Sequence, residues 1–220
     1  MSAPGPAAGG RYRRRRILLA IGMGAPLFAL AAVIAGALAY PGFDHARQYL
    51  SELGGAKSPV PLIFNGGVLA AGVGAAAAGV GFGLAVLALS GARIAAAVTA
   101  LSFVLAGVGL VMASLFPWPD PRHAFVNLGL GIQIAPVLLI WALWRVEGLA
   151  GLRRFLAVVF VLMAVLTVIT KHLVFRGTVN DANVGWWERA FAVVLVGWTG
   201  VAAFLLERKL VELARWNTPN

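Results

Sequence analysis

Long apolar runs separated by short polar connections dominate the pattern of this chain. Six runs carry few or no charged residues, and each approaches or exceeds the about 20 helical residues that cross a bilayer. They cover residues 17–39, 62–89, 94–116, 124–144, 155–172 and 188–206. Because lipid cannot hydrogen bond to exposed backbone, such runs adopt helices. The sequence therefore predicts an all-α fold class, a polytopic membrane bundle of six transmembrane helices with a short surface helix in the first outer loop.

Composition supports this interpretation and limits the number of domains. Apolar residues make up 60% of the 220 residues and charged residues 12%, against about half and a quarter in soluble domains. We therefore expect a disordered basic arm over 1–16, a membrane domain over 17–206 and an amphipathic tail over 207–220. The chain has no cysteine, which excludes disulfides, thiol nucleophiles and cysteine metal sites.

The net charge of +10 comes largely from cations on one side of the predicted bundle. Arg13–Arg16 precede the first run, three arginines lie in the connection 145–154, and Arg208 and Lys209 follow the last run. Cytoplasmic loops are enriched in such cations. The distribution predicts a multi-pass protein of a bacterial inner (plasma) membrane with both termini in the cytoplasm, and it argues against a nucleic-acid partner.

The first outer connection, residues 40–65, is unusually polar for a turn between two spans. Asp44 is a suitable N-cap and Gly54 with Gly55 a suitable C-terminal stop, so we expect a short helix between them. On that helix His45, Gln48 and Glu52 share one face. Leu50 and Leu53 lie on another face, which we expect to rest on the bilayer surface.

Most of the acids and all the histidines fall on the predicted outer side. They are His45, His123, His172, Asp44, Glu52, Asp120, Asp181 and Glu188, with the in-span polar residues Asn65 and Gln133 below them. One explanation is that polar loop residues collect where cations are rare. The other, which we favour, is that three outer loops converge on a polar pocket covered by the first-loop helix.

The adjacent pair Glu188-Arg189 favours the pocket. Charged residues at the mouth of a span are costly unless they face the bundle and find partners. We expect Arg189 to pair with Glu52 or Asp120, or to bind an anionic lipid head group, because guanidinium suits bidentate contacts.

The same residues carry a resemblance to a known family. Tyr40-Pro41-Gly42-Phe43, Leu50-Ser51-Glu52-Leu53-Gly54, Asn65-Gly66, Phe116-Pro117 with Asp120 and His123, and Glu188-Arg189 make up the pattern. In these motifs the chain resembles the bacterial and archaeal membrane proteins grouped as domain of unknown function 998, over nearly its whole length after the arm. The resemblance implies a six-helix membrane protein and supplies no activity.

Three classes of function remain open. The first is recognition, without catalysis, of a lipid or lipid-linked head group, or of a protein partner in the membrane. The binding residues would be Asp44, His45, Gln48, Asn65, Asp120, Glu188 and Arg189.

The second class is a small-solute transporter. The gathering of charges at one face disfavours it, since transporter sites lie near the midplane. Haem binding is also disfavoured, because no span carries a pair of deep histidines.

The third class is a metal-dependent, membrane-embedded hydrolase or transferase acting on a lipid. His45, His123 and His172 would hold a divalent metal such as zinc with an open water position. Ser51 would act as nucleophile or oxyanion donor, Glu52 as general base and His123 as a further catalytic residue. Against this hypothesis, neither His-x-x-x-His nor His-Glu-x-x-His spacing occurs.

Overall fold

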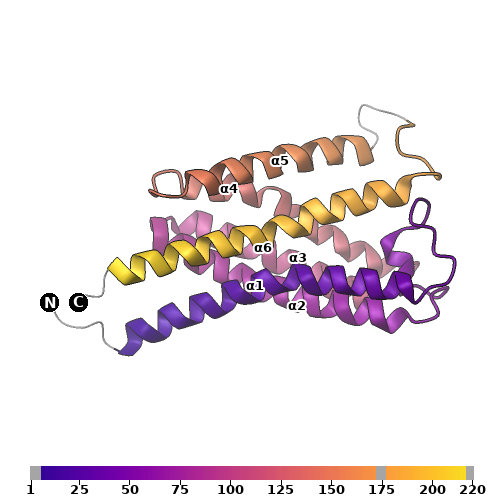
Figure 1. Ribbon diagram of the computed structural model, residues 1–220, viewed down its shortest axis with the longest axis horizontal. Coiled ribbons are helices and arrows are strands. Elements are labelled where there is room, and N and C mark those ends of the chain that lie inside the picture. The colour runs from indigo at the N-terminus through magenta and orange to yellow at the C-terminus, as the bar shows by residue number, and fades with distance from the viewer. Residues whose placement is uncertain (1–5, 172–176, 217–220) are drawn as a thin grey trace.

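The long apolar runs form helices that lie side by side in a bundle (Figure 1). The structure, a computed structural model, describes residues 6–171 and 177–216, and these contain no strand. The elements are α1 (Pro6–Leu38), the 3-10 helix η1 (Leu50–Gly54), α2 (Pro61–Ser90), α3 (Arg93–Leu115), the 3-10 helix η2 (Pro121–Gln133), α4 (Ala135–Ala142), α5 (Ala150–Thr170) and α6 (Val184–Trp216).

Within the residues that the structure describes, six stretches are long and apolar enough to cross a membrane, which confirms the predicted all-α bundle of six spans. They are Arg13–Leu38, Pro61–Ser90, Arg93–Leu115, Pro121–Ala142, Ala150–Thr170 and Val184–Ala214. The fourth span differs in kind from the prediction, because most of it is 3-10 helix rather than α-helix. Helix α1 begins inside the predicted basic arm, and α6 continues into the predicted tail.

Both ends of the chain's helical part lie at one end of the bundle. Figure 1 shows the start of α1 beside the end of α6, and Arg16 Nε lies 2.6 Å from Glu207 Oε1. We call this the terminal end. Residues 39–60, which we call loop 1, lie at the opposite end with the start of α6, and we call that the loop-1 end. Two assignments stay predictions: that the terminal end faces the cytoplasm, and that the protein lies in an inner membrane.

Helices α2 and α3 approach each other closely because glycines face each other between them. A Cβ added to Gly72 would lie 2.8 Å from the carbonyl oxygen of Gly107, and one added to Gly107 would lie 2.5 Å from that of Gly72. Small residues allow such contact between membrane helices. The glycines of α2 thus have a packing role at the α2–α3 contact. Deeper in the core, Phe82 and Phe103 stack with ring centroids 4.5 Å apart.

Loop 1 differs from the predicted surface helix. Residues 44–48 form turns, and the helical part is the five-residue η1. Leu53 is fully buried, so it does not rest on the bilayer surface as expected. It packs beside Gly36 of α1, where an added Cβ would lie 3.7 Å from Leu53 Cβ. Leu53 anchors loop 1 by burying apolar surface inside the bundle.

Candidate functional site

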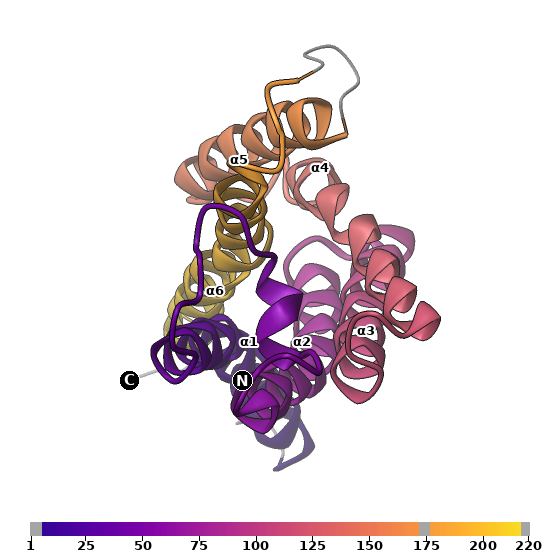
Figure 2. The same cartoon turned by 90° about the vertical axis from the view of Figure 1, so that its right-hand side faces the viewer.

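Loop 1 extends across the end of the bundle from α1 to α6 and returns to α2 (Figure 2). It is held there by hydrogen bonds to the first turns of α6. The amide of Gly185 donates to the carbonyl oxygen of Ala46 at 2.7 Å. The amide of Leu50 donates to Oε2 of Glu188 at 2.5 Å. Glu188, predicted to be a site residue, therefore binds loop-1 backbone.

Gly185 makes this close approach possible. A Cβ at that position would lie 2.5 Å from the carbonyl oxygen of His45 and 2.6 Å from that of Gln48. Any larger residue would push loop 1 away from α6. The sequence prediction missed Gly185. The available signal was its position directly before Trp186-Trp187-Glu188-Arg189.

Arg189 lies under loop 1 with only part of its guanidinium bound. Its Nη1 donates to the carbonyl oxygens of Gln48 at 3.0 Å and Gly185 at 2.7 Å. Its Cζ lies 5.3 Å from the ring centre of Phe43. Its Nε and Nη2 are buried and have no hydrogen-bond partner in the described part of the chain. We call this the Nε–Nη2 edge.

The pairing expected for Arg189 is thus replaced by another. Its hydrogen bonds go to main-chain carbonyls and not to Glu52 or Asp120. Both carboxylate oxygens of Glu52 accept hydrogen bonds within loop 1. Oε1 accepts from the amide of Tyr49 at 2.9 Å, and Oε2 accepts from Nε2 of Gln48 at 3.0 Å. The general-base role predicted for Glu52 stays untested.

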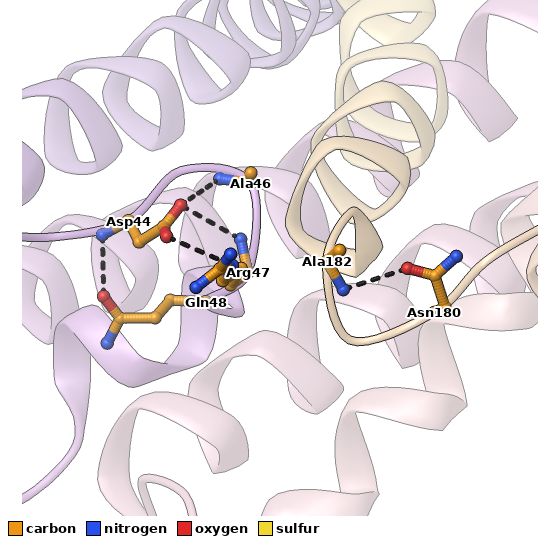
Figure 3. Close-up of polar contacts among 6 residues, drawn as sticks. All are labelled: Asp44, Ala46, Arg47, Gln48, Asn180 and Ala182. Atoms are coloured by element: carbon orange, nitrogen blue, oxygen red, sulfur yellow. Dashed lines mark hydrogen bonds and ion pairs between the residues drawn. The ribbon is translucent and has the colours of Figure 1, made fainter.

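Two turns at the loop-1 end are built on side-chain oxygens, as Figure 3 shows. Asp44 Oδ1 accepts from the amides of Ala46 at 2.9 Å and Arg47 at 3.3 Å. Asn180 Oδ1 accepts from the amide of Ala182 at 3.0 Å, shortly before α6 begins. Asp and Asn favour such turns because their short side chains reach nearby amides. The capping geometry expected of Asp44 is present, although it closes a turn instead of a helix.

Gln48 connects the two acids of loop 1. Its Oε1 accepts from the amide of Asp44 at 2.8 Å while its Nε2 donates to Glu52. Below them, Nδ2 of Asn65 donates to the carbonyl oxygen of Gly54 at 3.0 Å. A Cβ on Gly54 would lie 2.0 Å from Oδ1 of Asn65, so this position requires glycine. Gln48 and Asn65 therefore organise loop 1.

The connection before η2 lies next to loop 1. A Cβ on Gly55 would be 3.0 Å from the carbonyl oxygen of Trp118. Arg122 donates to both carboxylate oxygens of Asp120, at 3.0 and 2.8 Å, and these bonds lower the pKa of Asp120 to about 2. Nδ1 of His123 lies 3.0 Å from the carbonyl oxygen of Phe116. Asp120 and His123 thus have local partners within their own connection.

The predicted metal ligands do not form a cluster in the described ranges 6–171 and 177–216. No group of three or more His, Asp and Glu side chains there could hold a metal ion. His45 is exposed and stacks on Trp186, with ring centroids 6.1 Å apart. His172 lies outside the described residues. Ser51 is half-buried on η1. Since His172 is not described, the metal and catalytic assignments stay predictions.

Two further polar features lie away from loop 1. Oγ1 of Thr167 donates to Oε1 of Gln133 at 3.0 Å, which joins α5 to η2. A pocket that the sequence did not predict opens where the end of α2 meets the end of α4. Its lining consists of Leu89, Ser90, Trp141, Ala142, Trp144, Arg145 and Val146.

A family model described as "Protein of unknown function (DUF998)" matches residues 23–205. This match confirms the resemblance drawn from the loop-1 and α6 motifs. The comparisons with curated proteins and with solved structures give no match.

Proposed function

The chain belongs to the protein family of unknown function DUF998, and we propose that it recognises the anionic head group of a lipid or lipid-linked molecule at the outer leaflet. The observation that carries the proposal is the buried Nε–Nη2 edge of Arg189, which lacks a partner among the described residues. Arg189 is the anion-binding residue in this proposal, and loop 1 covers it.

The chemistry of the guanidinium supports an oxygen anion as the ligand. Nε–H and Nη2–H point in parallel, and this pair of donors matches two oxygens of a phosphate or carboxylate. Nη1 is already used to hold Gln48 and Gly185. Arg189 therefore performs two tasks with separate parts of one side chain, one toward the loop and one toward the ligand.

The energetics also favour a ligand. A buried donor without a partner costs about 1–3 kcal/mol, and more when it is charged. Two ligand oxygens would remove that cost. The edge is shielded from solvent in this conformation, so loop 1 must shift for a ligand to enter. The hydrogen bonds that hold the loop to α6 contribute about 1 kcal/mol for Gly185 to Ala46 and about 1.5–3 kcal/mol for those of Glu188 and Arg189, amounts that the hydrogen bonds of a bound anion can offset.

The surroundings of the site suit the membrane–water boundary. Trp186 is 58% exposed and Tyr49 47% exposed at the loop-1 end. Such aromatic side chains are enriched where lipid head groups begin. The cations gathered toward the terminal end indicate that the loop-1 end faces outward.

The test is lipid binding to the purified full chain in detergent, measured by native mass spectrometry with defined phospholipids. Arg189→Gln is expected to weaken head-group binding about tenfold or more, because hydrogen bonds to charged groups contribute about 1.5–3 kcal/mol. Arg189→Lys is expected to recover only part of it, since lysine lacks the parallel donors.

Two controls separate the anion contact from other effects. Arg93→Gln removes an exposed guanidinium at the start of α3, away from loop 1, and is expected to leave binding unchanged. Glu188→Gln weakens the loop bond at Leu50 while leaving Arg189 intact, and binding is expected to persist. Equal binding by wild type and Arg189→Gln would contradict the proposed function.

A further inference from the structure

The charge around Arg189 limits the kind of head group that fits, and this inference rests on the proposed function. Three carboxylates act electrostatically on Arg189: those of Glu188, Asp44 and Glu52. One other guanidinium lies in the cluster, that of Arg47, whose Nε is 3.7 Å from Oδ2 of Asp44. Three carboxylates therefore face two guanidinium groups, so acidic side chains outnumber basic ones in this cluster.

A purely anionic head group would meet repulsion in this cluster. Its phosphate could bind the Nε–Nη2 edge, but its charge would add to that of the surrounding acids. Repulsion between like charges is stronger near a protein or membrane surface than in bulk water, because the effective dielectric constant is lower. A head group that carries its own cation avoids this repulsion.

Loop 1 also offers acceptors for a cation. Oδ2 of Asp44 faces Arg47 only at 3.7 Å, beyond hydrogen-bond distance, while Oδ1 accepts the two turn amides. Each oxygen of Glu52 accepts one hydrogen bond and retains capacity for another. An ammonium with N–H groups could use these acceptors.

Aromatic rings extend along the same surface. The ring centroids of Tyr40 and Phe43 lie 5.4 Å apart, those of Phe43 and His45 5.2 Å, and those of His45 and Trp186 6.1 Å. Asp44 lies within this series, between Phe43 and His45 in the chain. Aromatic faces attract ammonium groups, so these rings add to the attraction that the carboxylate of Asp44 exerts on an ammonium.

We infer that the ligand is a zwitterionic lipid head group, in which a phosphodiester binds the Nε–Nη2 edge of Arg189 and a primary ammonium binds Asp44 and Glu52. This is the phosphoethanolamine class of head group. A primary ammonium is chosen over a quaternary one because the carboxylates supply hydrogen-bond acceptors, which a quaternary ammonium cannot use.

The experiment is competition among lipids on the full chain in detergent. The protein is mixed with equal amounts of phosphatidylethanolamine, phosphatidylglycerol and phosphatidylcholine, and the bound lipids are counted by native mass spectrometry. Phosphatidylethanolamine is expected to exceed each of the others by about fivefold, the preference that one exposed ion pair can supply. Soluble phosphoethanolamine at equal concentration is expected to displace little of the bound phosphatidylethanolamine. Full displacement would overturn the assignment to a lipid.

Variants then test the ammonium contact. Asp44→Asn keeps the oxygen that accepts from Ala46 and removes the charge, so the preference over phosphatidylglycerol is expected to disappear while binding persists. The matched control, Asp181→Asn, changes an exposed acid near Asn180 and is expected to retain the preference. Preference for phosphatidylglycerol or phosphatidylcholine in wild type, or an unchanged preference in Asp44→Asn, would overturn the inference.

The two proposals fail in different ways. If no lipid binding depends on Arg189, the proposed function is wrong. If binding depends on Arg189 but the purely anionic lipid is preferred, only the zwitterionic assignment is wrong.

Discussion

Two glycine-dependent contacts in this protein have opposite consequences. Between α2 and α3, Gly72 and Gly107 bring two backbones together inside an apolar core. Between loop 1 and α6, Gly185 brings two backbones together at the surface, beside charged side chains. In the first contact the helices satisfy their own backbone groups, and the gain is packing. In the second, the carbonyls of Gln48 and Gly185 accept hydrogen bonds from Nη1 of Arg189. The Nε–Nη2 edge of Arg189 is then left for another partner.

The comparison separates a structural contact from a candidate site. Both depend on the missing Cβ of glycine, so the glycines alone do not distinguish them. What distinguishes them is whether polar groups lack partners within the described ranges, as Nε and Nη2 of Arg189 do at the loop-1 end. Substitutions at the two glycines should therefore affect different properties of the protein.

The largest effect is expected from Gly107→Ala in the α2–α3 contact. The new Cβ would lie 2.5 Å from the carbonyl oxygen of Gly72 and force the helices apart. We expect a loss of about 2 kcal/mol in the free energy of unfolding, which is typical of overpacking a tight interface. The measurement is unfolding of the detergent-solubilised protein followed by tryptophan fluorescence. Gly24→Ala, where a Cβ meets nothing within 4 Å, is the matched control, and equal stability of both variants would contradict the packing role.

A smaller and local effect is expected from Gly185→Ala. The added Cβ would displace the carbonyls of His45 and Gln48 and break the bonds between loop 1 and α6. With bonds of about 1–3 kcal/mol each, hydrogen-exchange protection of residues 46–52 should fall about tenfold or more while global unfolding changes little. Hydrogen exchange read by mass spectrometry measures this. Gly197→Ala, which meets nothing within 4 Å, should leave loop 1 protected, and global destabilisation by Gly185→Ala would remove the contrast with Gly107.

The smallest effect concerns pH at the connection before η2. The pKa of Asp120 is lowered to about 2 by its hydrogen bonds to Arg122, so the contact stabilises the folded connection above the ordinary aspartate pKa of about 4. That stabilisation is lost as the pH falls through about 2. Carbon-13 NMR of the aspartate carboxyl groups should show one that titrates near pH 2 and is missing in Asp120→Asn. Titration of Asp120 near its ordinary value would show that the Arg122 contact does not form.

Much of the fold could be predicted from the sequence because the hydrophobic length of a span is a local property. Each run contains its own evidence for crossing a bilayer, and the alternation of spans places loop 1 and the start of α6 at the same end. The motifs around Glu52, His123 and Arg189 also indicate the family from residue type and spacing alone. The 3-10 geometry of the fourth span was missed, since hydropathy does not distinguish 3-10 helix from α-helix.

The candidate site was predicted only in part. The sequence marked Asp44, Glu52, Glu188 and Arg189 as unusual, and all of them belong to the cluster at the loop-1 end. Their partners were not all predicted. Arg189 was expected to pair with Glu52 or Asp120 or to bind an anionic head group; the acids are replaced by the carbonyl of Gln48 in loop 1 and that of Gly185 in α6, and the head group stays a prediction.

The sequence by itself determined the six spans, the family and the end of the bundle at which the unusual charges gather, since these depend on residue type and order. Only the tertiary structure decided that Leu53 is buried in the bundle, that Gly185 admits loop 1 against α6, and that one edge of Arg189 has no partner among the described residues. The physical reason is that every residue except proline carries the same amide and carbonyl. No sequence pattern specifies which backbone groups an arginine will meet, and only the close approach of distant segments selects them.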